Sequence, residues 1–202
     1  DLSPTPAQSE VLGRLLPAVV ARAFAPFLLW GSTGSGKTEV YLRAAAAALE
    51  AGRGVLYLVP EIGLTPLLVS RIEARFPGQV ALLHSAVPPR ARRAAWEEIR
   101  QGTKRFVVGA RSAVFAPLPD LGLVIVDEEH DPSYKQEDAP RYNGRDVAVV
   151  RARLASVPVV LGSATPSLES FHHARQGRYV LLALGGRVED RPMPEVQLVD
   201  MR

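Results

Sequence analysis

The chain has 202 residues, of which 47% are hydrophobic and 22% are charged, the composition of an ordinary globular protein. It contains no cysteine, which excludes disulfides, thiol catalysis and cysteine-ligated zinc from this stretch of sequence. The net charge is +3, so a polyanionic partner is permitted but not required. Because no apolar run is long enough to cross a membrane and no signal peptide opens the chain, we expect a cytoplasmic protein with no membrane partner.

Short apolar runs alternate with helical stretches along the chain. This alternation predicts an α/β fold, a mostly parallel sheet with helices on both faces, in which ligands bind at the carboxyl ends of the strands. In chain order the pattern predicts a strand at 27–30, a helix at 38–51, a strand at 54–59, a helix at 67–76, a strand at 80–83, a helix at 90–101, strands at 106–108 and 121–126, a helix at 145–154, a strand at 157–161, a helix at 167–176 and a strand at 179–182.

The domain is expected to span residues 1–184. Residues 185–202 contain Pro192 and Pro194, and we interpret them as a connection that leaves the domain. Since the sequence begins with Asp1 in place of Met, we expect it to be a piece of a longer protein.

A phosphate-binding loop is predicted at residues 31–38, Gly-Ser-Thr-Gly-Ser-Gly-Lys-Thr, between the first predicted strand and the helix after it. In such a loop, backbone N–H groups and a helix N-terminus surround a phosphate chain. Lys37 is expected to reach the β- and γ-phosphates, and the Thr38 hydroxyl to bind Mg2+. The alternative is a Gly- and Ser-rich turn that contains Lys-Thr by chance. The predicted nucleotide-binding residues here are Gly34, Ser35, Gly36, Lys37, Thr38 and Glu39.

An acidic box, Asp-Glu-Glu-His-Asp at residues 127–131, ends the strand predicted at 121–126. Asp127 is placed to hold Mg2+ and Glu128 to polarise the attacking water, so these two and Lys37 form the predicted catalytic set. An isolated acidic cluster after a strand is more often a solvated loop, but the phosphate loop upstream favours the catalytic interpretation. For His130, a structural role and a role in linking this site to motion both remain open.

Several segments, taken in order, resemble the first motor lobe of the PriA family, the superfamily 2 DNA helicases that restart stalled bacterial replication forks. The resemblance covers residues 2–202 and implies a RecA-like P-loop NTPase domain that uses ATP and Mg2+. The segments that carry it are 31–42, 59–66, 83–85, 90–102, 109–117, 127–131, 133–136 and 162–169.

The resemblance also implies roles for single residues. Gln8 is similar to the glutamine with which these motors read adenine, although a polar residue that starts a helix is an equally simple interpretation. Residues 163–165, Ser-Ala-Thr, resemble the motif that couples hydrolysis to domain movement, with His130 as its partner. The predicted coupling residues are therefore His130, Ser163 and Thr165, and the residues predicted to contact one DNA strand are Thr65, Arg111 and Ser112.

Residues 134–145 resemble the aromatic-rich loop through which DNA binding is signalled to the ATP site in this family. Tyr134 and Tyr142 are expected to stack on bases, and Lys135 and Arg141 to meet phosphates. The loop departs from the family at residues 139–140, 143 and 144, where Ala-Pro, Asn and Gly stand. These departures leave a thinner stacking platform. The arginines at 90, 92 and 93 alternate with acidic residues and are interpreted mainly as a solvated helix face.

Three functions compete on this evidence. The first is a motor of 3′-to-5′ polarity on single-stranded and forked DNA, associated with the nucleoid, with primosome and single-strand-binding proteins as partners. The second is a fork-bound scaffold without ATP-driven unwinding, and the third is an unrelated P-loop enzyme such as a nucleotide kinase. In such motors a second lobe supplies arginines to the γ-phosphate, so this chain alone is expected to bind nucleotide and hydrolyse it poorly. Zinc is expected only in a later segment.

Overall fold

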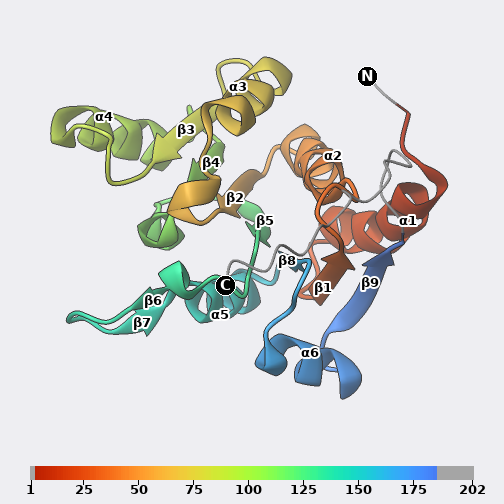
Figure 1. Ribbon diagram of the computed structural model, residues 1–202. Coiled ribbons are helices and arrows are strands. Elements are labelled where there is room, and N and C mark those ends of the chain that lie inside the picture. Colours follow the sequence, from red (N-terminus) through yellow and green to blue (C-terminus); the bar gives the residue numbers. More distant parts are fainter. Residues whose placement is uncertain (1–2, 186–202) are drawn as a thin grey trace, which may run out of the picture.

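The computed structural model describes residues 3–185, which form a seven-stranded sheet and a separate small hairpin (Figure 1). Three short 3-10 turns, η1 (Glu61–Gly63), η2 (Arg111–Phe115) and η3 (Pro132–Tyr134), follow β2, β4 and the acidic box. The helices are α1 (Pro6–Ala21), α2 (Lys37–Glu50), α3 (Pro66–Arg75), α4 (Pro89–Arg100), α5 (Gly144–Ala155) and α6 (Leu168–Arg175). The strands are β1 (Pro26–Gly31), β2 (Gly54–Leu58), β3 (Val80–Leu83), β4 (Phe106–Gly109), β5 (Leu121–Val126), β6 (Lys135–Gln136), β7 (Tyr142–Asn143), β8 (Val159–Ser163) and β9 (Val180–Leu184).

The predicted α/β class is confirmed, and each predicted strand and helix has a counterpart whose ends differ by two residues or fewer. The strand predicted at 157–161 is the largest shift, because it runs from Val159 to Ser163. The antiparallel hairpin β6–β7 was not predicted. The connection predicted at residues 185–202 lies outside the described residues except for Gly185.

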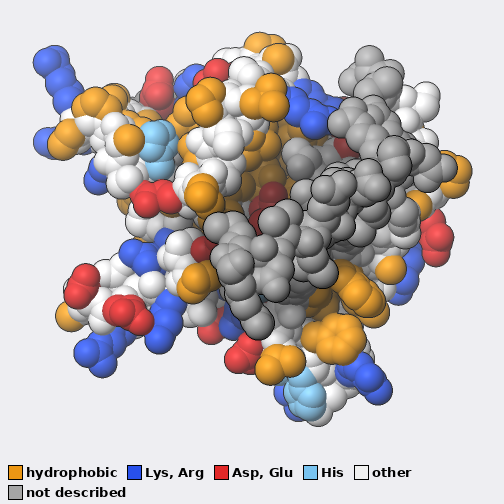
Figure 2. All heavy atoms as spheres, viewed as in Figure 1, with side chains coloured by type: hydrophobic (Ala, Val, Ile, Leu, Met, Phe, Trp, Pro, Cys, Tyr) orange, Lys and Arg blue, Asp and Glu red, His pale blue; other side chains and the backbone are white. Residues whose placement is uncertain are grey.

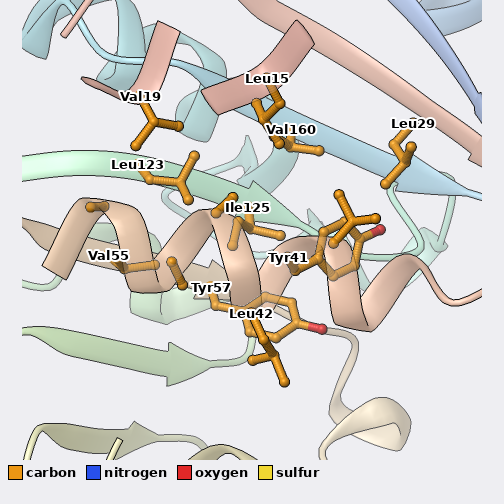
Figure 3. Packing of buried hydrophobic residues seen from close by; sticks show 14 of the residues in the cluster. Leu15, Val19, Leu29, Tyr41, Leu42, Val55, Tyr57, Leu123, Ile125 and Val160 are labelled. Atoms are coloured by element: carbon orange, nitrogen blue, oxygen red, sulfur yellow. The ribbon is translucent and has the colours of Figure 1, made fainter. Parts of the chain in front are cut away.

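The strands of the large sheet are ordered β3-β4-β2-β5-β8-β1-β9, and every neighbouring pair is parallel. The helices divide between its faces, with α1, α2 and α3 packed on one apolar cluster and α4, α5 and α6 on the other. Figure 3 shows the first cluster, in which Leu15 and Val19 of α1 lie over Leu123 and Val160 of the sheet. The strands are apolar on both sides because both faces are covered.

The strand order places the predicted motifs along one edge of the sheet. The acidic box follows β5, residues 163–165 lie at the end of β8, and the phosphate loop follows β1, and these three strands are neighbours. The carboxyl ends of β3, β4 and β2, which are also neighbours, lead into His84, Arg111 and Glu61. One edge therefore carries two separate groups of functional candidates. None of the helices in residues 3–185 combines the length and the apolar character needed to cross a bilayer.

Candidate functional site

The phosphate loop has the backbone shape that a phosphate chain requires. Gly34 and Gly36 adopt left-handed φ angles of 81° and 89°, which glycine accepts without steric cost. The loop turns directly into α2, which begins at Lys37, so the first N–H groups of this helix lack helical acceptors. The Lys37 ammonium lies back over the loop and donates to the Gly31 carbonyl at 2.9 Å. These features form a cradle of N–H donors closed by one buried cation.

The cradle opens into a hollow of about 490 Å3. The Ser35 hydroxyl lies beside this hollow rather than in its lining, is buried, and has no hydrogen-bond partner in the described part of the chain. The N-terminus of α2, the Lys37 ammonium and the carboxylates at this hollow are complementary to a phosphate chain with its Mg2+, so the residues present fit a nucleoside polyphosphate. The hollow is lined by Ser3, Thr5, Gln8, Thr33, Gly34, Gly36, Lys37, Thr38, Glu39, Arg71, Asp127 and Glu128.

Gln8 has the structural role at a helix start that the sequence offered as one of its two interpretations. Its Oε1 accepts from the Thr5 N–H at 2.9 Å while the Thr5 hydroxyl accepts from the Gln8 N–H, a capping box at the start of α1. Its Nε2 donates to the Gly36 carbonyl at 3.3 Å, so the same side chain joins α1 to the phosphate loop. Its predicted contact with adenine stays a prediction.

Asp127 is held by two buried tyrosines. The Tyr41 hydroxyl donates to Asp127 Oδ1 at 3.0 Å, and the Tyr57 hydroxyl donates to Oδ2 at 3.2 Å. Oδ1 also accepts from the Glu128 N–H at 3.1 Å. Burial raises the pKa of Asp127 and the charge of Glu128 raises it further, whereas the Tyr41 hydrogen bond and the Lys37 charge lower it. Because Oδ1 already accepts two bonds and Oδ2 accepts one, Oδ2 keeps the free lone pair that a metal ion or its water needs.

These tyrosines were missed at the sequence level, where they read as ordinary core residues. Figure 3 shows Tyr41 of α2 and Tyr57 of β2 among aliphatic side chains, with both hydroxyl groups turned toward the same end of the core. Burial raises the pKa of both phenols well above the usual value, and the Asp127 charge adds to the effect, so they stay protonated donors. Gly162 provides the room, since a Cβ there would lie 1.5 Å from the Tyr41 hydroxyl oxygen.

Glu128 is the more accessible of the two predicted catalytic carboxylates. Its Oε1 lies 3.7 Å from the Lys37 ammonium, and its Oε2 lies 3.7 Å from His130 Nδ1. It has a left-handed φ of 43°, a conformation that costs free energy in a residue other than glycine. Glu128 therefore stands between the phosphate loop and His130.

The three predicted coupling residues are in contact. His130 Nδ1 lies 2.7 Å from the Ser163 hydroxyl, and Nε2 lies 3.3 Å from the Thr165 hydroxyl. The Ser163 hydroxyl also accepts from the Thr165 N–H at 2.9 Å. The imidazole thus bridges the ends of β5 and β8, beside Glu128. This contact is what a coupling role needs, but the role itself stays a prediction.

Glu129, the third acidic residue of the box, was given no role from the sequence. It is buried, and it accepts from the Ser167 N–H at 2.7 Å and from the Ser167 and Ser170 hydroxyls at 3.0 and 2.8 Å. Arg145 pairs with it at 3.2 Å. The carboxylate therefore fastens the acidic box to the first turns of α6 and α5. Its position beside two catalytic candidates concealed this structural role.

Glu39 lines the hollow, but its carboxylate is already engaged. It accepts from Arg43 on its own helix at 2.8 Å, and from Arg71 and Arg75 of α3 at 3.1 and 3.0 Å. Burial raises the pKa of Glu39, but the hydrogen bond and charge of Arg75, followed by those of Arg43, outweigh it and lower the pKa overall. Arg71, which the sequence did not single out, also lines the hollow and brings a positive charge to it.

Comparison with known proteins identifies the family. A model of the DEAD/DEAH box helicase family matches residues 5–173, which include the phosphate loop, the acidic box and residues 163–165. The chain belongs to the DEAD/DEAH box helicase family. This membership contradicts the third candidate function, an unrelated P-loop enzyme. It also implies the general use of ATP and Mg2+ by the domain.

Within this helicase family, the chain corresponds to the first helicase lobe of PriA proteins. It is 54% identical to the replication restart protein PriA of Bacillus subtilis over 176 residues, which cover 87% of the chain and 22% of that protein. The PriA of Synechocystis is 48% identical, with 98% of the chain and 24% of the relative covered. The chain thus spans about a quarter of the length of these curated relatives.

Solved structures agree with this assignment. RecG bound to a three-way DNA junction superposes with a TM-score of 0.68 and 26% identity, covering 91% of the chain and 24% of RecG. A hypothetical ATP-dependent RNA helicase of Sulfolobus tokodaii has a TM-score of 0.60 and 20% identity, covering 86% of the chain and 52% of that protein. The second likeness concerns the fold alone. A RecA-like helicase fold is therefore confirmed.

In this helicase lobe, the side chains predicted to contact a DNA strand lie away from the nucleotide hollow. The Thr65 hydroxyl caps α3 by accepting from the Leu68 N–H at 3.2 Å. Arg111 donates to the carbonyls of Ser133 and Lys135 and to the side chain of Gln136, so its two terminal nitrogens hold the following loop in place. The exposed Ser112 lines a groove beside it.

The structure corrects the prediction that Tyr134 stacks on DNA. Its side chain is only 1% exposed, and its hydroxyl donates to the Asp127 carbonyl at 2.7 Å. A ring enclosed on both faces cannot stack on a base, so Tyr134 instead fixes the loop to the acidic box. Gly144 explains the tight fit, because a Cβ there would lie 2.9 Å from Cγ of Arg111 and 3.5 Å from the Tyr134 ring.

The other candidates of this loop lie on the β6–β7 hairpin. Lys135 and Arg141 are exposed, and the half-buried Tyr142 packs edge-on against Phe115 with ring centroids 5.1 Å apart. Asn143 caps α5 by accepting from the Arg145 N–H at 3.0 Å. Asn143, which departs from the family pattern, thus acts as the N-cap of α5.

Proposed function

We propose that this chain is the ATP-binding motor lobe of a PriA-like replication restart helicase. The observation that carries the proposal is the convergence of the phosphate loop, Gln8, Asp127 and Glu128 on one hollow at the sheet edge. Residues 1–184 are the lobe in this proposal, and residues 185–202 lead toward the rest of the motor.

The chain's own residues divide the chemistry between them. The N–H groups of the phosphate loop and of the first turn of α2 bind the phosphates together with the Lys37 ammonium. Gln8, already turned to the loop, contacts the base. Glu128 takes up the proton of the attacking water, because it is the partly exposed carboxylate next to Lys37.

Thr38 and Asp127 are the residues that hold Mg2+ in this proposal. When bound, the ion supplies positive charge to the phosphate oxygens. Asp127 is suited to hold it because the tyrosine hydroxyls orient its carboxylate and leave one lone pair of Oδ2 free. This donor set fits Mg2+, which is normally bound through one or two carboxylates together with substrate phosphates.

In the whole protein, the lobe drives 3′-to-5′ movement on single-stranded and forked DNA. The names of the relatives support this proposal, since they are replication restart proteins and one structural neighbour is bound to a three-way DNA junction. Primosome and single-strand-binding proteins are the proposed partners at the nucleoid, and zinc belongs to other segments of the full protein. His130, Ser163 and Thr165 transmit the state of the nucleotide to the second lobe.

A comparison of the full-length protein with its Lys37→Ala variant on a forked duplex tests the proposal. We expect ATP-dependent unwinding by the wild type and its loss in the variant, because the phosphate chain loses its main cation. Equal unwinding by both proteins contradicts the motor. Fork binding without unwinding by either protein favours the scaffold function. That alternative was raised because residues 139–144 depart from the family's loop pattern.

The chain by itself is expected to bind nucleotide and turn it over slowly. An arginine that stabilises the transition state at the γ-phosphate is worth about 10^3- to 10^5-fold in rate in P-loop GTPases. Turnover near ~1 s−1 by the isolated chain, a rate typical of complete enzymes, contradicts this expectation.

A further inference from the structure

The second group of candidates on the sheet edge surrounds a groove of about 610 Å3. It lies where β2, β3 and β4 end, and we call it the aromatic groove. In Figure 2 the outline of the molecule is indented between the parts formed by α4 and by the β6–β7 hairpin. Its lining includes Glu61, His84, Arg92, Trp96, Ser112 and Phe115.

Large aromatic rings are exposed in and next to this groove. The Trp96 side chain is 38% exposed and Phe115 is 52% exposed. Phe115 packs edge-on against Tyr142, which is only half-buried and so extends the row of rings toward the hairpin. No described residue accepts a hydrogen bond from the Trp96 indole N–H. Aromatic rings that gather around one groove and stay exposed are typical of a binding site.

The two arginines that line the groove are, by contrast, held by carbonyl and amide oxygens of the protein. Arg111 uses both terminal nitrogens on the loop at residues 133–136. Arg92 donates to the carbonyls of Ser85 and Val87 at 3.2 Å. These contacts fix the positions of both guanidinium groups. Their charges nevertheless remain and attract a polyanion.

We infer that the aromatic groove binds the bases of a single DNA strand by stacking, with Trp96 and Phe115 as the platform. Trp96 and Phe115 present exposed ring surface to the groove, and unpaired bases are the part of a DNA strand that matches such rings. Arg92 and Arg111 supply the complementary charge. This inference rests on the proposed function for the presence of DNA, and it adds base contacts to the backbone contacts expected from the sequence.

Abasic DNA tests the inference, because it keeps the phosphates and lacks the bases. In a Trp30→Phe background Trp96 is the sole tryptophan. We expect an oligothymidylate to quench its fluorescence and an abasic strand of equal length to leave it unchanged. The affinity of the chain for oligothymidylate, measured by the anisotropy of a labelled strand, is expected to fall roughly 5- to 150-fold in Trp96→Ala. The abasic strand is expected to bind both proteins equally.

Further variants separate stacking from a loss of folding. Trp96→Phe is expected to recover most of the affinity for oligothymidylate, whereas Trp96→Leu, of similar apolar character, is not. Trp30→Ala removes the other exposed indole and is expected to leave DNA affinity unchanged.

The outcomes distinguish this inference from the proposed function. Equal affinity for oligothymidylate and the abasic strand, with no selective loss in Trp96→Ala, overturns the stacking inference and leaves the motor proposal intact. Binding of neither strand contradicts both the inference and the DNA-binding part of the proposed function. A chain that binds no nucleotide but still stacks on oligothymidylate contradicts only the ATP-binding part of the proposed function.

Discussion

At the scale of single residues, the orientation of Asp127 depends on hydroxyl groups buried behind it. Tyr41 and Tyr57 each donate to a different carboxylate oxygen. Without them, a carboxylate at this depth would have fewer partners and a greater cost of burial. The tyrosines therefore act on any metal ion through Asp127, as positioning residues.

The Tyr57→Phe variant tests this arrangement. Loss of the hydroxyl leaves Asp127 Oδ2 without its donor, and we expect the free energy of unfolding to fall by about 1 kcal/mol. We expect the gain in ADP affinity on addition of Mg2+ to fall by about tenfold or more, as for other groups that orient a metal ligand. Fluorescent ADP titrations with and without Mg2+ measure this gain. Tyr179→Phe, on the opposite face of the sheet, is the control, and an unchanged gain in Tyr57→Phe contradicts the positioning role.

At the scale of elements, two buried or half-buried carboxylates join segments that are distant in sequence. Glu39 joins α2 to α3 through Arg71 and Arg75. Glu129 joins the acidic box to α6 and α5. Each link thus fixes a segment next to the nucleotide hollow to helices that pack beside it.

The Glu39 link predicts a specific dependence on pH. Because the folded chain lowers the pKa of Glu39, the carboxylate contributes stability above its unfolded pKa, and this contribution is lost as the pH falls through the lower native pKa. We expect Glu39→Gln to reduce the free energy of unfolding by about 1–2 kcal/mol at pH 7. The difference is expected to shrink as the pH drops below about 4. Urea denaturation of both proteins across this range measures it, and a difference that is constant with pH contradicts the link.

The Glu129 link predicts a larger cost. In Glu129→Ala the partly buried Arg145 loses its main buried partner, and we expect the free energy of unfolding to fall by about 3–5 kcal/mol. Glu129→Gln keeps the shape and an acceptor, so a smaller loss is expected. Hydrogen exchange in the first turn of α6 is expected to accelerate in Glu129→Ala, because the Ser167 N–H loses its acceptor. A Glu129→Ala variant as stable as the wild type contradicts the link.

At the scale of the whole molecule, the strand order divides one sheet edge between two groups of candidate binding residues. The neighbours β5, β8 and β1 carry the nucleotide candidates, and β3, β4 and β2 lead into the aromatic groove. Arg111 and Tyr134 belong to the boundary, since Arg111 holds the loop at 133–136 and Tyr134 fastens that loop to Asp127. The aromatic groove is therefore connected to the acidic box through these two side chains.

Nucleotide binding is expected to stabilise the whole lobe. A ligand at 100 times its dissociation constant adds about 2.7 kcal/mol to the free energy of unfolding. We expect Mg-ADP to raise the melting temperature of the chain and to have little effect on Lys37→Ala. Gly13→Ala, at an open position of α1, is the control and should respond to Mg-ADP as the wild type does. An equal shift in Lys37→Ala contradicts the location of the site.

Much of the candidate site could be predicted because its motifs are local. The phosphate loop and the acidic box each place their residues within eight positions of one another, so spacing alone conveys their chemistry. The Tyr134 prediction was wrong because aromatic character in a loop does not reveal burial, which here comes from the close approach of Gly144 and Arg111. Tyr41, Tyr57 and Glu129 were missed because each acts through a partner in another element.

The amino-acid sequence by itself determined the α/β class, the positions of the strands and helices, and the chemistry of the two nucleotide motifs, since all of these depend on periodicity and short spacings. Only the tertiary structure decided which strands are neighbours, and hence that the box after β5, Ser163 and the phosphate loop meet at one edge. It also decided which polar groups are already satisfied and which rings stay exposed. The physical reason is that burial and partnership depend on contacts between segments far apart in the chain.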